Sequence, residues 1–395
     1  MLPAPRVAIG QVFRVALRLG LTSFGGPIAH LGFFRREYVD RRHWIDPATF
    51  GDLIALCQAL PGPASSQLGI AIGTTVAGRL GGIVAWLGFT TPSALAMLAF
   101  AALSRSESIA GAGWVHGLAL AAVAVVAVAV VAMARAHAAE ARRVAIAGAG
   151  AVVAFTMPSP VTGPLVILAG AVLGRLLLGR RAEPGTALSR VGRALPRGAL
   201  LALAAFAGLL AVLPLARIVG GQTVAIVDTF YRSGALVFGG GHVVLPLLHA
   251  GTVDPGWVAN ADFVAGYGAA QALPGPLFTF AAYLGSVAGP APNGPLGGLL
   301  ALGAIFLPSF LLVFGLLPVW SRWRADARIR SALDGAAAVV VGLLLAALVD
   351  PVATTGLRSW LDVAMAAVAA VALTSGRVPV VAVVATLAAV GQLGG

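Results

Sequence analysis

The apolar and polar positions divide the chain into long apolar runs separated by short loops that carry arginine. About 20 apolar residues are enough for an α-helix to cross the hydrocarbon core of a bilayer. The pattern therefore predicts an all-α polytopic membrane protein. The full spans that we assign are 82–103, 115–134, 144–157, 163–178, 199–219, 298–318, 332–349, 359–374 and 379–393.

Four further apolar segments contain helix breakers near their middle. These segments are 9–34 with Gly25-Gly26, 48–78 with Pro61-Gly62-Pro63, 223–249 with Gly239-Gly240, and 261–289 with Pro274-Gly275-Pro276. A break at membrane depth is tolerated only where protein or a water-filled cavity covers the freed backbone groups. Arms of about 12–14 residues measure about 20 Å, which reaches the middle of the membrane and returns. We predict four re-entrant hairpins.

The breaks occupy corresponding places in two similar halves. Phe24-Gly25-Gly26 recurs 214 residues later as Phe238-Gly239-Gly240, and Gln58-Ala59-Leu60-Pro61-Gly62-Pro63 recurs as Gln271-Ala272-Leu273-Pro274-Gly275-Pro276. Pro92-Ser93 is echoed by Pro308-Ser309. Matches in one order at a nearly constant offset indicate a duplication. We place one repeat at 9–179, a basic loop with a linking span at 180–222, and the second repeat at 223–394.

The arginines predict that the two repeats are inverted. All 26 basic residues are arginine, and cytoplasmic loops of membrane proteins are enriched in basic residues. Loop 35–46 carries four arginines, whereas its counterpart 249–262 carries none and contains Asp254 and Asp262. The bias reverses between loops 104–113 and 321–331. We expect a cytoplasmic N-terminus, and we attribute the net charge of +12 to orientation in the bilayer rather than to nucleic-acid binding.

Catalytic and metal-binding patterns are lacking in the sequence. Cys57 is the only cysteine, which excludes an intrachain disulfide and argues against a thiolate metal cluster. We find no paired aspartates on facing helices and no Ser–His constellation at matched depth. We therefore expect no enzyme activity, metal or cofactor.

The breaks predict a binding site for a small dianion. A helix that begins inside the membrane presents free N–H groups and a positive dipole end, which together bind oxyanions. Arg18 and Arg232 could add one permanent charge from each repeat, and Asp228 is the candidate for proton coupling. The predicted substrate-binding residues are Arg18, Phe24, Gly25, Gly26, Gln58, Pro61, Gly62, Ser65, Ser66, Gln67, Arg232, Phe238, Gly239, Gly240, Gln271, Gly275, Phe278 and Thr279.

Each assignment has a structural alternative. The breaks could be kinks without a ligand, and the two glutamines could bond the broken backbone. Arg18 could extend to the membrane interface, and Arg232 could simply pair with Asp228 four residues earlier. Ser65 and Ser66 could be ordinary helix caps. The histidines, including His30 and His249, are expected to pack or lie at the interface.

The motifs resemble those of the chromate ion transporter family in its long, two-repeat form. The matching residues are Phe24-Gly25-Gly26-Pro27, Trp44, the Gln58–Pro63 motif with Ser66-Gln67-Leu68, Phe238-Gly239-Gly240-Gly241-His242, Leu245-Pro246-Leu247, Trp257, and the Gln271–Pro276 motif with Phe278-Thr279-Phe280. The chain departs from the family at His249, where a carboxylate is common, and in having only Asp46 and Asp52 as acids after the first tryptophan.

The resemblance implies export of chromate across the inner membrane, with sulfate as a competitor. We expect a secondary active transporter in which the two repeats rock around the shared site, with proton antiport as one means of coupling. A passive oxyanion channel, a sulfate or other oxyanion transporter, and a structural membrane protein remain alternatives. The expected partners are the oxyanion and the lipid bilayer, with a homodimer as a further expectation.

Overall fold

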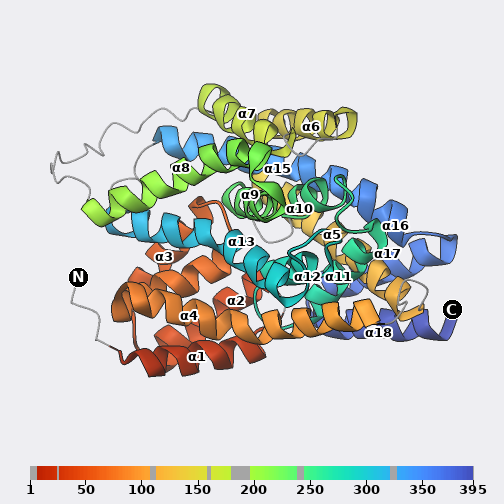
Figure 1. The fold of residues 1–395 in the computed structure, drawn as a ribbon, viewed down its shortest axis with the longest axis horizontal. Helices are drawn as coiled ribbons and strands as arrows, with labels where there is room; N and C mark the ends of the chain where they lie inside the picture. The colour runs from red at the N-terminus through yellow and green to blue at the C-terminus, as the bar shows by residue number, and fades with distance from the viewer. Residues whose placement is uncertain are drawn as a thin grey trace.

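The computed structural model describes residues 7–24, 26–106, 113–157, 162–178, 196–237, 244–320 and 327–394, and every regular element within them is helical (Figure 1). The predicted all-α class is therefore confirmed. Five helices in this part of the chain are long and apolar enough to cross a membrane: Ala64–Ser104, Gly113–His137, Arg197–Val219, Gly294–Val319 and Arg330–Gly356.

All nine segments predicted as full spans form helices. They are α4 (Ala64–Ser106), α5 (Gly113–His137), α6 (Ala141–Thr156), α7 (Thr162–Leu177), α8 (Arg197–Val219), α13 (Gly294–Leu316), α15 (Ala327–Ala347), α17 (Trp360–Thr374) and α18 (Val380–Gly394). Four of them, α6, α7, α17 and α18, have only 15 or 16 residues. At 1.5 Å per residue they are about 24 Å long or less, which is shorter than a ~30 Å hydrocarbon core.

The segments predicted to be broken are interrupted at the expected places. In the first half, α1 (Ile9–Thr22) is followed by α2 (Gly26–Phe34), and four residues separate the end of α3 (Pro47–Ala59) from the start of α4. In the second half, α9 (Gly221–Ala235) precedes α10 (Val244–Thr252). There α11 (Asn260–Ala272) is followed by the short 3-10 turn η4 (Leu277–Thr279) and by α12 (Phe280–Val287).

Within α4 a kink separates a short arm from a long span. Ala77 and Gly78 have non-helical dihedral angles, and Gly78 has a φ of +69°. Residues 64–76 therefore form the second arm of the predicted 48–78 segment, and the long span follows the kink.

The prediction of a loop at 35–46 is wrong for its first seven residues. The chain continues from α2 into a π-helical segment, η1 (Arg35–Arg41). Glu37, at 11% side-chain exposure, accepts hydrogen bonds from Arg41 at 3.2 Å and Arg42 at 2.6 Å. These ion pairs neutralise part of the arginine charge of the segment, while Tyr38 and Val39 are buried in the core.

Helices of the two halves pack in the same way at matched positions. α1 packs on α4, and α9 packs on α13. A Cβ at Gly20 would meet the carbonyl group of Phe89, and a Cβ at Gly234 would meet that of Ile305. Gly234 follows Gly20 by 214 residues, and Ile305 follows Phe89 by 216. The same close crossing, which only a small residue permits, therefore occurs in each half.

The long helices α5 and α15 each pack against the last two helices of the opposite half. α5 contacts α17 and α18, whereas α15 contacts α6 and α7, which lie along the upper edge of Figure 1. Glycines allow the closest approaches: Gly117 packs against α18 near Gly391, and Gly335 packs against Gly174 of α7. Each half therefore contributes one long helix that packs against the last two helices of the other half.

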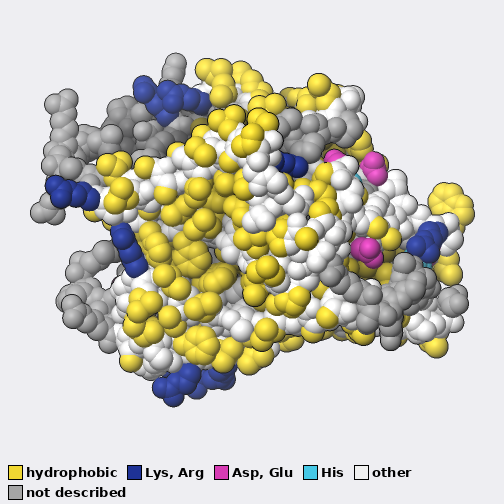
Figure 2. All heavy atoms as spheres, viewed as in Figure 1, with side chains coloured by type: hydrophobic (Ala, Val, Ile, Leu, Met, Phe, Trp, Pro, Cys, Tyr) yellow, Lys and Arg dark blue, Asp and Glu magenta, His cyan; other side chains and the backbone are white. Residues whose placement is uncertain are grey.

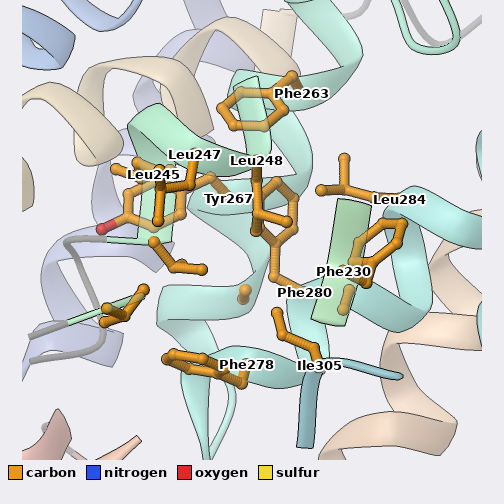
Figure 3. Packing of buried hydrophobic residues seen from close by; sticks show 14 of the residues in the cluster. Phe230, Leu245, Leu247, Leu248, Phe263, Tyr267, Phe278, Phe280, Leu284 and Ile305 are labelled. Carbon is orange, nitrogen blue, oxygen red and sulfur yellow. The ribbon is translucent and has the colours of Figure 1, made fainter. Parts of the chain in front are cut away.

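Aromatic and branched side chains fill the core beside the second pair of breaks. In the packing drawn in Figure 3, side chains of α9 to α13 converge from both arms of the broken segments, among them Phe230, Leu248, Phe263, Tyr267, Phe280 and Ile305. A second cluster, around Leu56, Leu68 and Phe89, lies beside the first pair. The breaks are thus held by rigid packing on both sides.

The outer surface is strongly apolar. Large side chains of α8 are exposed, including Leu201 at 70% and Ile218 at 80%, as expected for a helix that faces lipid. In Figure 2 most arginine side chains on the visible face lie toward the left, and the acidic side chains lie toward the right. On this face, charge is therefore distributed unequally along the long axis.

Candidate functional site

The two Pro-Gly-Pro breaks have nearly the same backbone geometry. Leu60 has φ −87° and ψ 146°, and Leu273 has φ −90° and ψ 145°. The glycine that follows has a positive φ in both, +122° at Gly62 and +99° at Gly275. Because residues with a Cβ are strained in this region, glycine is required at both turns.

Each Pro-Gly-Pro break contacts the glycine break of the other half. The Gly62 N–H donates to the Val237 carbonyl at 2.6 Å, and the Gly275 N–H donates to the Ser23 carbonyl at 3.0 Å. Ser23 directly follows the end of α1, and Val237 lies at the equivalent place after α9. Each Pro-Gly-Pro break therefore contacts the residue just before the glycine motif of the other half, and the two contacts are reciprocal.

Two serines at matching positions of the halves also contact the Pro-Gly-Pro breaks, each from the opposite half. A Cβ on Gly62 would lie 2.9 Å from Ser309 Oγ of α13, and a Cβ on Gly275 would lie 2.8 Å from Ser93 Oγ of α4. Each glycine thus packs tightly on a serine that the opposite half supplies. The recurring Pro-Ser dipeptide had indicated only a duplication, and its contact with the breaks was not predicted.

Several buried polar atoms of the first half have no hydrogen-bond partner among the described residues. Gln67 is fully buried and donates from Nε2 to the Pro61 carbonyl at 2.6 Å, but its Oε1 has no such partner. The hydroxyls of Ser23, Ser66 and Thr90 are likewise buried without one. Because an unsatisfied buried polar group costs about 1–3 kcal/mol, such a group calls for a ligand, a water or a functional reason.

The remaining predicted side chains at the Pro-Gly-Pro breaks differ in exposure. Ser65, Phe278 and Thr279 are buried, and the Thr279 hydroxyl bonds the Pro276 carbonyl at 2.9 Å. Gln271 is half-buried and hydrogen-bonded to Tyr267, whereas Gln58 at the end of α3 is exposed. The two glutamines are therefore equivalent in sequence but not in environment.

At the glycine breaks the structure describes fewer of the predicted residues. Phe24 is half-buried, and Gly26 begins α2. The predicted residues Gly25, Phe238, Gly239 and Gly240 lie outside the described part of the chain.

The two predicted arginines lie in different surroundings. Arg18 is exposed, whereas Val15, Ala16 and Leu19 form the buried face of α1. Arg232 has 13% side-chain exposure and lies in the last turn of α9. The structure therefore does not bring Arg18 together with Arg232.

Asp228 and two arginines form a buried cluster on α8 and α9. Asp228 is fully buried, and Arg232 contacts both carboxylate oxygens, with Nε to Oδ1 at 2.7 Å and Nη2 to Oδ2. Arg217 of α8 reaches Oδ2 at 3.4 Å and Thr229 Oγ1 at 3.3 Å, and it covers the ring of Trp257. The Asp228–Arg232 pair was foreseen from the spacing of four residues. Arg217 was missed, because no sequence signal places it there.

A cavity of about 180 Å³ lies between α6, α7, α10 and α15. Its polar lining includes His249, Asp254 and Asp350, and His249 Nδ1 lies 3.2 Å from Asp254 Oδ1. A smaller cavity shares Leu247 with it and is lined by Arg232, Thr229 and Ser233. One cavity therefore carries acidic groups in its lining, and the other carries Arg232 of the Asp228 cluster.

Comparison with known proteins agrees with these motifs. The model of the family described as "Chromate transporter" matches residues 10–175 and 224–392. The chain is 30% identical over 363 residues to a chromate transport protein of Pseudomonas aeruginosa, covering 90% of this chain and 83% of the relative.

Two other relatives are similar over comparable lengths. A chromate transport protein of Cupriavidus metallidurans is 26% identical, covering 88% of this chain and 83% of the relative. A probable chromate transport protein of Synechococcus elongatus is also 26% identical, covering 87% and 85%. No solved structure matches the chain. The family model covers most of both halves, and the chain therefore belongs to the chromate transporter family.

Proposed function

We propose that the protein is a secondary active transporter that exports chromate, a tetrahedral dianion, across the inner membrane. Two observations support this proposal: the family membership, and the reciprocal meeting of the four breaks through Gly62 with Val237 and Gly275 with Ser23. The proposal includes sulfate as a competitor, because it shares the shape and charge of chromate.

The two halves, 9–179 and 223–394, act in this proposal as inverted repeats whose broken segments are re-entrant. Reciprocal contacts, in which residue i of one half meets residue j of the other and j meets i, are expected of a two-fold interface. The Gly62–Ser309 and Gly275–Ser93 contacts and the exchanged packing of α5 and α15 follow this rule. The reversal of arginine bias between matched loops supports a cytoplasmic N-terminus.

The oxyanion is proposed to bind where the breaks meet. The first N–H groups of α2 and of α4, with the matching groups after the second-half breaks, would supply donors, and Ser65, Ser66, Gln67, Gln58, Gln271 and Thr279 would add side-chain contacts. The Gly62 and Gly275 N–H groups now bond carbonyls of the opposite half. If an anion accepted hydrogen bonds from these two N–H groups, their hydrogen bonds to the opposite half would break. Anion binding would then be linked to the rocking of the repeats.

Arg232 is the cation best placed to hold the anion from the second half. Arg18 is a second proposed contact of the anion. It can reach the site only if α1 rotates so that its exposed face turns toward the site. Arg18→Gln tests it, because this exposed residue can be changed with little effect on stability: lower chromate affinity would support the contact, and unchanged affinity would remove Arg18 from the site.

The membrane potential would favour export, by roughly 2.3 kcal/mol per charge per 100 mV. Exchange against protons is an alternative driving force, with Asp228 as its candidate carrier. A homodimer would place exposed apolar surface, such as that of α8, against a second copy. A passive oxyanion channel remains the alternative, because the same breaks could line a pore.

Chromate flux into proteoliposomes tests the proposal. We expect saturable uptake that sulfate inhibits, together with a planar-bilayer recording that lacks unitary currents. Gly62→Val, which would block the contact with Ser309, should abolish flux, and Gly148→Val on the open side of α6 should not. Unitary chromate currents would favour the channel, and the absence of chromate flux would refute the proposal.

A further inference from the structure

Asp228 occupies the position on Arg232 that an oxyanion would take. Its two oxygens face the Nε and Nη2 groups of the guanidinium, which is the forked arrangement by which arginine also holds a tetrahedral oxyanion. Arg217 approaches the same carboxylate from α8 at 3.4 Å. A small cavity lined by Arg232, Thr229 and Ser233 adjoins the cluster. The buried carboxylate and an incoming anion would therefore compete for the same donors.

The charges of this cluster match a dianion only when Asp228 is neutral. Two arginines and one carboxylate leave a single positive charge, whereas protonated Asp228 leaves two. A bound dianion beside ionised Asp228 would create a net negative charge in a buried site, which is costly. With Asp228 protonated, the same anion neutralises the cluster.

The helices that pack on α9 carry few other titratable groups in their described residues. α8 contributes Arg217, which cannot release a proton at accessible pH. α10 contributes His249, whose ring contacts Asp254 and Asn260, each at 3.2 Å. The sequence of α13, Gly294–Leu316, contains no titratable residue. Among these elements, Asp228 is therefore the carboxylate that can exchange a proton as the anion binds.

We propose that Asp228 is a tethered competitor of the transported oxyanion, so that a dianion binds Arg232 and Arg217 together with one proton on Asp228. The inference rests on the proposed oxyanion transport. Coupling between two binding events is reciprocal, so the proton promotes anion binding and the anion promotes proton uptake. The proton comes from water on the side where the anion enters, and both leave together. This is cotransport, the opposite of proton antiport, in which the two ligands must exclude each other.

Chromate binding to the purified full-length protein tests whether the proton promotes or opposes anion binding. Between about pH 7.5 and 9, where chromate is a dianion, wild-type affinity should fall by up to about tenfold per pH unit. Asp228→Asn mimics the protonated acid and should bind chromate with an affinity independent of pH. Asp334→Asn removes a carboxylate that pairs with Arg143 elsewhere, at 2.9 Å, and should keep the wild-type dependence.

A dye that reports protons gives a second measurement, which needs no variant. Mixing wild-type protein with chromate in weak buffer should show proton uptake, approaching one proton for each anion bound. Two results would overturn the inference: a wild-type affinity for chromate that is independent of pH and comes without proton uptake, or an affinity that rises with pH. Neither result would contradict the proposed oxyanion transport. Wild-type protein that fails to bind chromate at any pH would instead refute the proposed function.

Discussion

The glycine at the centre of each Pro-Gly-Pro break meets two independent requirements. Its φ is positive, and the position of its missing Cβ is close to a serine of the opposite half, Ser309 at Gly62 and Ser93 at Gly275. A larger residue would therefore strain the turn and crowd that serine, and at Gly62 it would also crowd Gln67 Nε2 of the same half, which lies close to the Cβ position. The sequence motif predicted the turn, whereas the contact between halves depends on tertiary structure.

Gly62→Ala and Gly275→Ala should each destabilise the protein and abolish transport. Backbone strain costs about 1–3 kcal/mol, and the clash with serine adds to it. Gly78→Ala is the matched control, because Gly78 has a φ of +69° but open space around the position of a Cβ. Its cost should be about 1–3 kcal/mol from backbone strain alone, without loss of transport. Thermal unfolding and chromate flux would measure both effects. Equal behaviour of the three variants would contradict the proposed role of the contact.

Arg232→Gln should destabilise the protein by up to about 3–5 kcal/mol, because it removes the forked partner of a buried carboxylate. The double variant Asp228→Asn with Arg232→Gln should recover most of this stability, since no buried carboxylate is left without a partner and the remaining Arg217 is 27% exposed. It should bind chromate more weakly than Asp228→Asn alone, because only one of the two cations remains. Thermal unfolding separates the two effects, and a double variant that binds chromate normally would exclude Arg232 from the site.

At the residue scale, the sequence was informative only where chemistry is local. The spacing of Asp228 and Arg232 on one helix face was sufficient to foresee their pair. Arg217 comes from another helix, and the carbonyls of Ser23 and Val237 carry no residue-specific signal. These partners therefore could not be predicted from the chain alone.

Among the helices, α5 and α15 hold the two halves together. Apolar periodicity predicted all nine long segments, because length and composition determine which runs become helical. It could not predict that α15 would lie against α6 and α7 of the other half. It also missed η1, where Glu37 pairs with arginines that were expected to lie in a loop.

Gly174→Leu should separate α7 from α15. Gly174 lies directly against the backbone of Ser331 and Gly335, so a large side chain has no room there. Overpacking of this kind costs about 1–3 kcal/mol or more. Gly148→Leu on α6 is the control, since nothing lies within 4 Å of its Cβ position. Thermal unfolding in detergent should show a lower midpoint for Gly174→Leu alone, and equal midpoints would contradict this packing role.

For the whole molecule, the proposed proton coupling would set the energetics of the proposed export. A dianion that leaves with one proton carries one net negative charge. A membrane potential negative inside favours this by roughly 2.3 kcal/mol per 100 mV, and each pH unit of outside acidity opposes it by about 1.4 kcal/mol. Export is then driven by voltage and by the chromate gradient, and a more acidic exterior should slow it.

Labelling of single cysteines would test the inverted topology. In a Cys57→Ser background, Asp40→Cys should react only with a reagent on the cytoplasmic side, and Asp254→Cys only with one outside. Asp40 lies near the arginines of the first half, and Asp254 lies in the matching, arginine-free turn. Reaction of both positions from one side would show that the halves are not inverted.

The central claim is that the paired breaks of the two halves hold the transported oxyanion. The anomalous scattering of chromium in a chromate-bound crystal would locate the anion most directly. We expect the peak between the breaks, with chromate replacing the Gly62–Val237 or the Gly275–Ser23 hydrogen bond, or beside them on Arg232. A specific chromium peak away from both breaks and from Arg232 would contradict this account.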